Sequence, residues 1–165
     1  MAFSKRTYKR LRDFLGDLWF PVRNTRRLKQ VKERNLVTPL FQERLMIAVT
    51  VVNGCRYCSY FHAKMALKVG LEQREIQALL SGEFSSCPED EAIGIAYAQH
   101  WAGADAHPDP EAVQRLQQTY GTERADAIHL ILRMIRMGNL TGNTLDYMLY
   151  RLSFGLWGGS KPTQG

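Results

Sequence analysis

The sequence has few cysteines and no hydrophobic run long enough to cross a membrane. Three cysteines in 165 residues are too few and too unevenly spaced for the disulfide framework of a small secreted protein. The longest nearly uninterrupted apolar stretch, residues 45–52 with Thr50 inside it, is far short of the roughly 20 residues of a membrane-spanning helix. The basic N-terminus lacks a continuous apolar block followed by a cleavage site of small residues. We therefore expect a soluble, cytoplasmic protein.

Alternation of apolar and polar residues, the pattern of a half-buried strand, is equally scarce. β-Branched residues gather only around residues 49–52. Apolar residues instead recur at spacings of three and four, and the length suits one domain. The sequence therefore predicts an all-α, single-domain helical bundle of about seven helices.

Capping residues indicate where most of these helices begin and end. Thr38 before Pro39 is typical of a helix start, and Gly70 of a helix end. The predicted helices cover residues 39–52, 55–69, 71–80, 88–101 and 110–121, followed by a long apolar segment from residue 122. Gly138, Gly142 and Asn143 are expected to loosen that segment before a last helix at residues 145–152.

Acidic residues are scarce in the first 34 residues, which hold eleven Lys or Arg against three Asp or Glu. The segment thus carries a charge of +8, so the remainder carries about −2 of the total of +6. Apolar residues at three- and four-residue spacings predict a basic amphipathic helix over residues 5–20, ended by Pro21, and a polar linker over residues 23–35. The predicted organisation is therefore an N-terminal helix and linker (1–34), a helical domain (35–153) and a flexible tail (154–165).

The basic helix allows two interpretations. With Phe14, Trp19 and Phe20 on or near its apolar side and arginines elsewhere, it has the features of a helix that lies on an anionic membrane surface. Such a stripe more often packs on its own domain or on a neighbouring subunit, and we favour that interpretation from sequence. No nucleic-acid-binding motif accompanies the charge, so we expect no nucleic-acid partner.

Four residues at fixed spacing carry the candidate chemistry: Glu43, Cys55, Cys58 and His62. Cysteines three residues apart at a helix start lie one turn apart, where a small adjustment brings them to disulfide distance. The helix N-terminus stabilises a thiolate there, and His62 lies one turn beyond Cys58 on the same face. The break at Asn53 and Gly54 allows the preceding helix to bring the Glu43 carboxylate close as a proton acceptor or relay.

Several alternatives remain open at this point. The helix terminus favours Cys55 as the nucleophile, whereas the histidine one turn on favours Cys58. A Cys-x-x-Cys pair with a histidine also suits zinc, although structural zinc needs four ligands and no second close pair is present. A third interpretation is that both cysteines are ordinary buried packing residues. The presence of Glu43 and His62 in register weakens this interpretation. We assign no role to Cys87, His100, His107 or His129.

Residues 43–80, ERLMIAVTVVNGCRYCSYFHAKMALKVGLEQREIQALL, resemble the core motif of the alkylhydroperoxidase AhpD-like and carboxymuconolactone decarboxylase superfamily. The glutamate, both cysteines, the histidine and the later glycine match in register. The segment NLTGNTLDYML, within residues 137–149, is similar more loosely. The resemblance implies an AhpD-like all-helical fold that assembles as trimers or hexamers.

The resemblance also implies a peroxidase or disulfide reductase, with Cys58 as the peroxidatic nucleophile and Cys55 as the resolving thiol. His62 and Glu43 would form the proton relay. The best-known alkylhydroperoxidase has a histidine between its cysteines. This chain has Tyr57 at that position, and many relatives also have a tyrosine there. The decarboxylase branch of the family lacks the cysteine pair, which argues against that activity here.

The expected chemistry needs no metal or organic cofactor. A thiolate reduces a hydroperoxide, the second cysteine closes a disulfide, and a dithiol, thioredoxin-like or lipoyl reductant reopens it. The alternative is a non-enzymatic, redox-sensing or structural oligomer of the same fold, in which the N-terminal helix allows contact with a membrane surface.

Overall fold

The structure, a computed structural model, describes residues 3–158. These residues form seven α-helices and no strand, which confirms the predicted all-α class. The helices are α1 (Leu11–Arg23), α2 (Thr25–Glu33), α3 (Pro39–Asn53), α4 (Arg56–Val69), α5 (Gln73–Ser81), α6 (Glu89–Gly103) and α7 (Pro110–Leu152).

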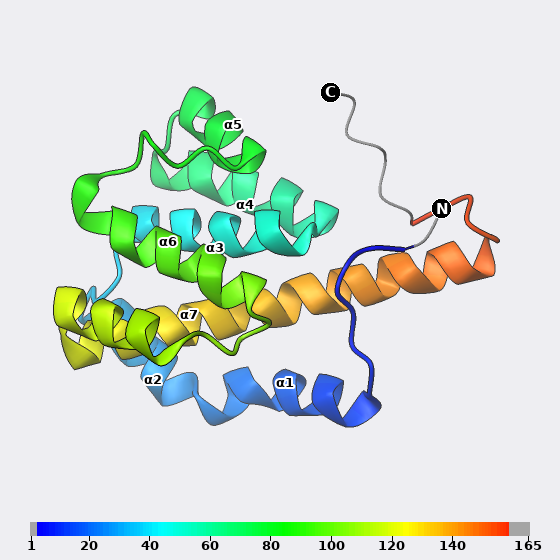
Figure 1. The fold of residues 1–165 in the computed structure, drawn as a ribbon, viewed down its shortest axis with the longest axis horizontal. Helices are drawn as coiled ribbons and strands as arrows, with labels where there is room; N and C mark the ends of the chain where they lie inside the picture. Colours follow the sequence, from blue (N-terminus) through cyan, green and yellow to red (C-terminus); the bar gives the residue numbers. More distant parts are fainter. Residues whose placement is uncertain (1–2, 159–165) are drawn as a thin grey trace.

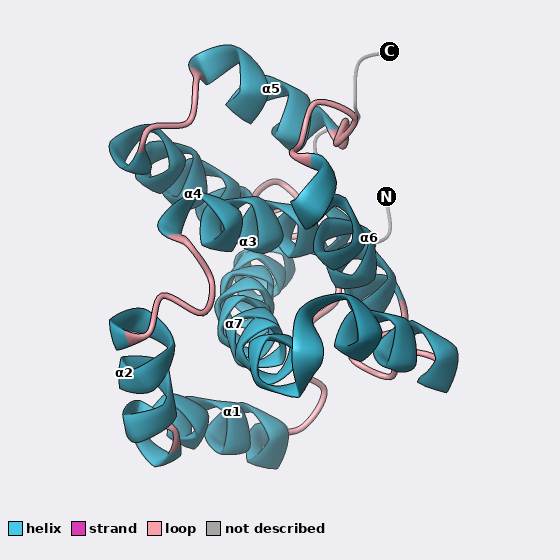
Figure 2. Cartoon of the chain, turned by 90° about the vertical axis from the view of Figure 1, so that its left-hand side faces the viewer, coloured by secondary structure: helices cyan, strands magenta, loops and turns pink. Residues whose placement is uncertain are grey.

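The part of α7 that follows Gly121 runs along the length of the molecule and separates two groups of helices. Figure 1 shows α1 and α2 on one side of α7 and α3 to α6 on the other. Seen from the end in Figure 2, α3 lies among α4, α5, α6 and α7, and it contacts all four. This central position explains why α3 is apolar nearly all round, since a helix covered on every side has no face that needs to be polar.

The hydrophobic core consists of two clusters that meet at α3. The larger joins α3 to α6 and α7 and includes the fully buried Phe41, Leu45 and Ile128. The smaller joins α3 to α4 and α5 through Ile47 and Leu79. Different faces of α3 therefore pack in different clusters. These contacts fix the position of α3, and with it the end of the helix at Asn53, from two sides.

Local capping signals define the ends of the central helices as predicted. The Thr38 hydroxyl accepts a hydrogen bond from the Phe41 backbone N–H at 3.2 Å, with Pro39 in the first turn. Gly54 and Gly70 end α3 and α4 in the left-handed conformation, with φ of 66° and 103°. Gly121 interrupts α7 with φ 74° and ψ 160°, where the sequence predicts that a short helix ends.

The prediction for the N-terminal helix is wrong in its limits. Residues 5–10 are not helical, and α1 runs past Pro21 to Arg23. The last turn persists because side chains bond its carbonyls: the Asn24 amide donates to Phe20 O, and the Thr25 hydroxyl to Pro21 O and Val22 O. Pro21 therefore lies inside α1 instead of ending it.

The predicted polar linker at residues 23–35 is also wrong, because most of it forms α2. Leu28 and Val31, three residues apart, pack on the larger core cluster, and Val31 is buried. Two apolar residues at helical spacing are the signal for this short helix, which packs beside α7.

Helix α7 is not loosened at Gly138, Gly142 and Asn143, as the sequence predicts, but continues without a break to Leu152. The Asn143 amide donates to the backbone oxygens of Asn53 and Arg6, so it bonds neighbouring segments and not its own helix. Glycine costs helix stability mainly through backbone entropy, and packing against α3 and α4 on this side offsets that cost.

Within residues 3–158, no helix is both long and apolar enough to span a bilayer. The predicted tail, residues 154–165, falls partly outside the described residues, which end at 158. The predicted domain boundaries stay predictions.

Candidate active site

The two cysteines lie where α3 ends and α4 begins. The left-handed Gly54 turns the chain, and its N–H bonds Thr50 O at 2.8 Å. Cys55 is the N-cap of α4, and its sulfur accepts a hydrogen bond from the Cys58 backbone N–H at 3.4 Å. The two Sγ atoms are 2.9 Å apart and belong to free thiols. The dithiol is therefore close enough to form a disulfide, whose S–S bond is about 2.0 Å, with a small movement.

The two thiols differ in acidity because they share one hydrogen bond. This bond to Cys58, aided by the backbone N–H groups of Cys58 and Tyr57, lowers the pKa of Cys55 to about 7 against the opposing effect of burial. The same bond, together with burial, raises the pKa of Cys58 above its ordinary value. The resting dithiol thus favours a thiolate on Cys55 and a proton on Cys58.

Solvent reaches the two sulfurs unequally. Cys55 is 0% exposed, whereas Cys58 is partly exposed. The more acidic thiol is therefore the one without access to solvent.

Glu43 and His62 form a second close pair. The Glu43 side chain on α3 lies against α4, where its Oε2 is 2.7 Å from His62 Nδ1, and both residues are buried. A carboxylate at Nδ1 favours the tautomer that carries its proton there, which leaves Nε2 as the acceptor nitrogen. The edge of the neighbouring Phe61 ring packs against the imidazole at 5.1 Å between centroids.

The dithiol and the Glu43–His62 pair are neighbours that do not touch directly. His62 follows Cys58 by one helical turn, so both side chains lie on the same side of α4. No hydrogen bond among residues 3–158 joins either sulfur to His62 or Glu43. Proton exchange between them therefore needs a side-chain rotation, a water molecule or the substrate itself, as is common in sites without a bound substrate.

Helix α7 supplies a wall of the site that the sequence pattern did not reveal. A Cβ built on Gly142 would lie 2.7 Å from Cys55 Sγ, and one on Gly138 would lie 3.8 Å from Cys58 Sγ. These two glycines, one turn apart, let α7 approach the dithiol closely. The only sequence signal is the loose family similarity of the segment that contains them.

A buried amide network joins this wall to α3. The Asn53 amide donates to Asn139 Oδ1, and the Asn139 amide donates to Thr50 Oγ1, both at 3.1 Å. The side chain of Asn139 also lowers the pKa of Cys58, against the larger effects that raise it. These buried groups satisfy one another, so the network fixes how α3 and α7 meet beside the sulfurs.

Asp146, one turn beyond Gly142, is another residue that sequence reasoning missed. Its carboxylate is fully buried and pairs with Lys5 Nζ at 2.9 Å and with Arg56 Nη2 at 2.7 Å. Arg56 follows Cys55 directly, and its guanidinium lies 4.8 Å from the centroid of the Tyr57 ring. The carboxylate thus ties the start of α4 and the N-terminal segment to α7.

Aromatic side chains surround the start of α4. Tyr57, Tyr60 and Phe61 are all exposed, so the surface beside the dithiol is rich in aromatic rings. This agrees with the expectation that they line the site or a contact between subunits, which the single chain leaves as a prediction.

The remaining thiol and histidines lie apart from this site. Cys87 is half-buried against both core clusters, and burial raises its pKa. His129 bonds the Tyr97 hydroxyl at 2.9 Å, and burial lowers its pKa. His100 Nε2 lies 3.3 Å from an Asp109 carboxylate oxygen. Among residues 3–158, no three His, Cys, Asp or Glu side chains gather closely enough to hold a metal ion.

Together these features define a class of protein: an all-helical bundle with a free dithiol at a helix start beside a buried carboxylate–imidazole pair. In a comparison with protein families, residues 23–87 match the model of the carboxymuconolactone decarboxylase family. The matched segment contains Glu43, Cys55, Cys58 and His62 but ends before α6 and α7. Neither curated proteins nor solved structures give a match.

Proposed function

We propose that the protein is a thiol-dependent oxidoreductase that reduces hydroperoxides or disulfides at Cys55 and Cys58. The observation that carries this proposal is the pair of free sulfurs 2.9 Å apart, one of them with its pKa lowered to about 7. A thiol of that acidity is substantially ionised at neutral pH, and the thiolate is the reactive form. The nearby Glu43–His62 pair adds an acid–base group.

Cys58 is the proposed nucleophile because it is the thiol that a substrate reaches. Cys55 has no exposed surface, which suits a resolving thiol that reacts with its neighbour only. When one thiol is ionised, the two sulfurs share a single proton. Movement of this proton from Cys58 to Cys55 leaves the thiolate on Cys58, the accessible sulfur. In this proposal His62 Nε2, one turn away, assists by accepting or returning a proton.

The proposed cycle balances in three steps. The Cys58 thiolate attacks the terminal oxygen of a hydroperoxide, the O–O bond breaks, and the cysteine becomes a sulfenic acid, while the leaving alkoxide takes a proton from solvent, directly or through His62, and departs as an alcohol. The Cys55 thiol then displaces water from the sulfenic acid to form the disulfide. An external dithiol, thioredoxin-like or lipoyl, reduces this disulfide by exchange and is itself oxidised to a disulfide.

Partner and assembly belong to the same proposal. The exposed Tyr57, Tyr60 and Phe61 beside the dithiol suit contact with a reductant or with a second subunit, since aromatic residues are enriched at interfaces. We propose a homo-oligomer, trimeric or hexameric, in keeping with the family resemblance.

The test is steady-state turnover of an organic hydroperoxide, and of a small disulfide, with a dithiol as reductant. Cys58→Ser should fall to the background rate, and Cys55→Ser should accumulate a sulfenic acid on Cys58 that a dimedone-type reagent labels. His62→Gln should lower kcat/KM by roughly 10²- to 10⁴-fold. Cys87→Ser is the matched control and should keep the full rate.

Two outcomes contradict the proposal. If the Cys58→Ser variant kept the wild-type rate, Cys58 would not be the nucleophile. A dithiol that oxidises once and is not turned over by any dithiol reductant would instead identify a redox sensor or a structural pair.

A further inference from the structure

The apolar face of α1 points away from the rest of the protein. Its exposed side chains follow one another at spacings of three and four, which places them on one face: Leu11, Leu15, Leu18, Trp19 and Val22. Leu11 is 72% exposed and Trp19 54%, and no residue of α1 is buried. We name these five residues the α1 stripe. Packing of this face on its own domain, one half of the sequence-based interpretation, is therefore wrong, whereas packing on a neighbouring subunit stays a prediction.

The opposite face of α1 is the one that attaches it to the domain. Asp17 accepts a hydrogen bond from the Tyr8 hydroxyl at 2.9 Å and lies 3.6 Å from an Arg136 guanidinium nitrogen of α7. The Arg133 guanidinium lies 4.0 Å from the centroid of the Phe20 ring. Because these contacts hold the face with Asp17 and Phe20 inward, the outward direction of the stripe follows from the packing of α1 on α7.

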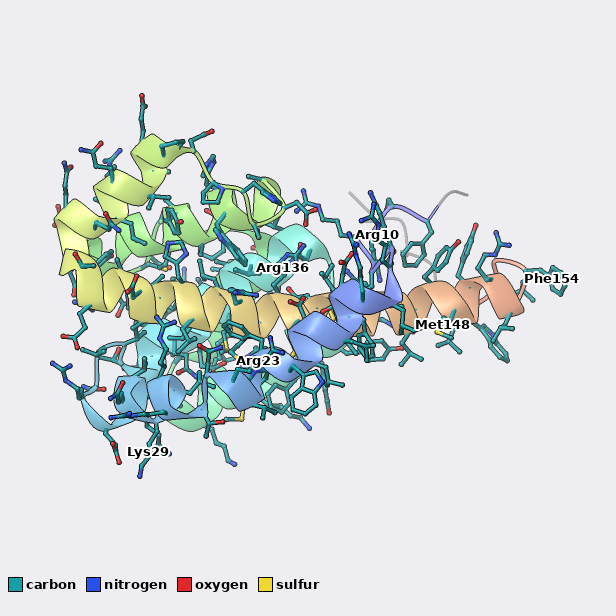
Figure 3. All side chains as sticks on the ribbon, turned by 90° about the horizontal axis from the view of Figure 1, so that it is seen from below. Arg10, Arg23, Lys29, Arg136, Met148 and Phe154 are labelled. Atoms are coloured by element: carbon teal, nitrogen blue, oxygen red, sulfur yellow. The ribbon has the colours of Figure 1, made fainter. Side chains whose placement is uncertain are left out.

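Cations accompany the stripe. Residues 9–34 contain nine Lys or Arg and three Asp or Glu, and all nine cations are exposed. Asp17 faces α7, and the remaining acids, Asp13 and Glu33, pair with cations of their own helices. Arg27 and Arg34 pair with Asp126 and Glu123 of α7, so the positive charge that these carboxylates leave unbalanced belongs to Lys9, Arg10, Arg23, Arg26 and Lys32. Figure 3 shows α1 crossing in front of α7 and α2 lying beside it, with Arg10 and Arg23 at the two ends of α1 and Lys29 on α2. The outer surface of the two helices is therefore strongly positive.

A cationic cleft of about 690 Å³ lies along the same helix. Arg12 and Gly16, each one residue after a leucine of the stripe, line it from α1, and a Cβ on Gly16 would meet only open space. The cleft has twice as many cations as carboxylates; the cations are Lys5, Arg6, Lys9, Arg12, Arg133 and Arg136. Several of these cations also pair with carboxylates: Lys5 with Asp146, Arg12 with Asp13, and Arg136 with Asp17 and Asp105. An excess of positive charge remains in the cleft, directly beside an apolar face.

We propose that the α1 stripe and the adjoining cleft bind the surface of an anionic phospholipid membrane. The leucines and Trp19 enter the boundary between headgroups and acyl chains, and the flanking cations and the cleft contact headgroup phosphates. A second copy of this chain is a poorer occupant, because pairing through α1 would bring two sets of exposed cations together. This inference is independent of the dithiol chemistry.

The test is co-flotation of the full chain with vesicles of phosphatidylcholine alone or mixed with phosphatidylglycerol. We expect binding to the mixed vesicles only, weakening as salt rises from about 0.1 M to about 1 M, which shortens the Debye length from about 10 Å to about 3 Å. With Trp157→Phe as background, Trp19 is the one exposed tryptophan, and its emission should shift to the blue on these vesicles.

Two pairs of variants separate the apolar and the charged contributions. Leu15→Glu/Leu18→Glu should abolish binding, whereas Leu67→Glu, an equally exposed leucine of α4, should not. Arg12→Gln/Arg23→Gln should weaken binding by about 25-fold, at roughly fivefold per cation near the surface. The charge-matched control Lys68→Gln/Arg74→Gln, on α4 and α5, should change it little.

Three results would overturn the proposal. The first is equal binding to neutral and anionic vesicles, and the second is unchanged vesicle binding of Leu15→Glu/Leu18→Glu. The third is a wild-type protein that does not bind vesicles but forms an oligomer in solution, which this double variant dissociates. The substituted positions are exposed, so circular dichroism should show intact helices in every variant.

Discussion

Cys58 determines the acidity of Cys55, because its hydrogen bond is the largest cause of the lowered pKa. Cys58→Ala removes this bond and leaves burial, which acts in the opposite direction. The backbone N–H groups of residues 57 and 58 still lower the pKa in this variant. We therefore expect the Cys55 pKa to rise from about 7 towards the ordinary cysteine value of about 8.5, measured by ultraviolet absorbance of the thiolate. A midpoint still near 7 would assign the acidity to the helix N-terminus instead.

The same shift has a consequence for stability. The pKa of Cys55 is lower in the folded than in the unfolded chain, so ionisation adds stability as pH rises from about 7 to about 8.5. This contribution is lost as pH falls back through 7. Denaturant unfolding of the reduced wild type should show the rise, and Cys58→Ala should lack it.

Gly142 and Gly138 make a matched pair for testing how closely α7 approaches the dithiol. Gly142→Ala would bring a methyl group within 2.7 Å of Cys55 Sγ, so it should cost about 1–3 kcal/mol by overpacking and slow disulfide formation. Gly138→Ala meets Cys58 Sγ at an ordinary 3.8 Å and should add about 0.5–1 kcal/mol through its better helix propensity. Equal effects of the two variants in urea unfolding would contradict this picture.

At the scale of elements, Asp146 joins α7 to the start of α4 and to the N-terminal segment. Asp146→Ala leaves Lys5 without its partner in a nearly buried position, so we expect a loss of about 3 kcal/mol in the free energy of unfolding. Hydrogen exchange should also speed up at Tyr8, whose N–H bonds Thr144 Oγ1 close to this pair.

The exposed pair Arg34–Glu123 is the control for Asp146. Glu123→Gln should cost less than about 1 kcal/mol, because solvent screens an ion pair on the surface. If Asp146→Ala cost no more than this control, the buried carboxylate would have no structural role.

At the scale of the whole molecule, Arg44 links three helices. From α3 its guanidinium reaches Glu75 of α5 at 2.7 Å and Glu91 of α6 at 2.9 Å. Arg44→Met leaves the buried Glu91 without its main partner and should cost about 3–5 kcal/mol at neutral pH. Arg74→Met, an exposed position on α5, should change stability by less than about 0.5 kcal/mol.

The loss of stability caused by Arg44→Met should increase as pH rises. Burial raises the pKa of Glu91, and Arg44 opposes that rise. Without Arg44 the folded-state pKa is higher still, so the penalty is small where the carboxyl is protonated and grows as pH rises through that pKa. Thermal unfolding of both proteins from acidic to neutral pH should show the difference in Tm widening.

Much of the site was predictable because its determinants are local. Thr38 and Gly54 set the ends of α3 through capping and a left-handed turn, and these need only neighbouring residues. The spacing of Cys55, Cys58 and His62 likewise follows from the pitch of one helix. The closeness of Glu43 to His62 needed one further step, the folding back of α3 on α4 at Gly54.

What only the tertiary structure decided are contacts between residues far apart in the chain. The approach of Gly142 to Cys55 and the burial of Asp146 depend on where α7 crosses the start of α4. The outward direction of the α1 stripe depends on Asp17 and Phe20 packing against α7. An amphipathic pattern indicates that a helix has an apolar face, but the neighbouring helices determine whether that face is covered.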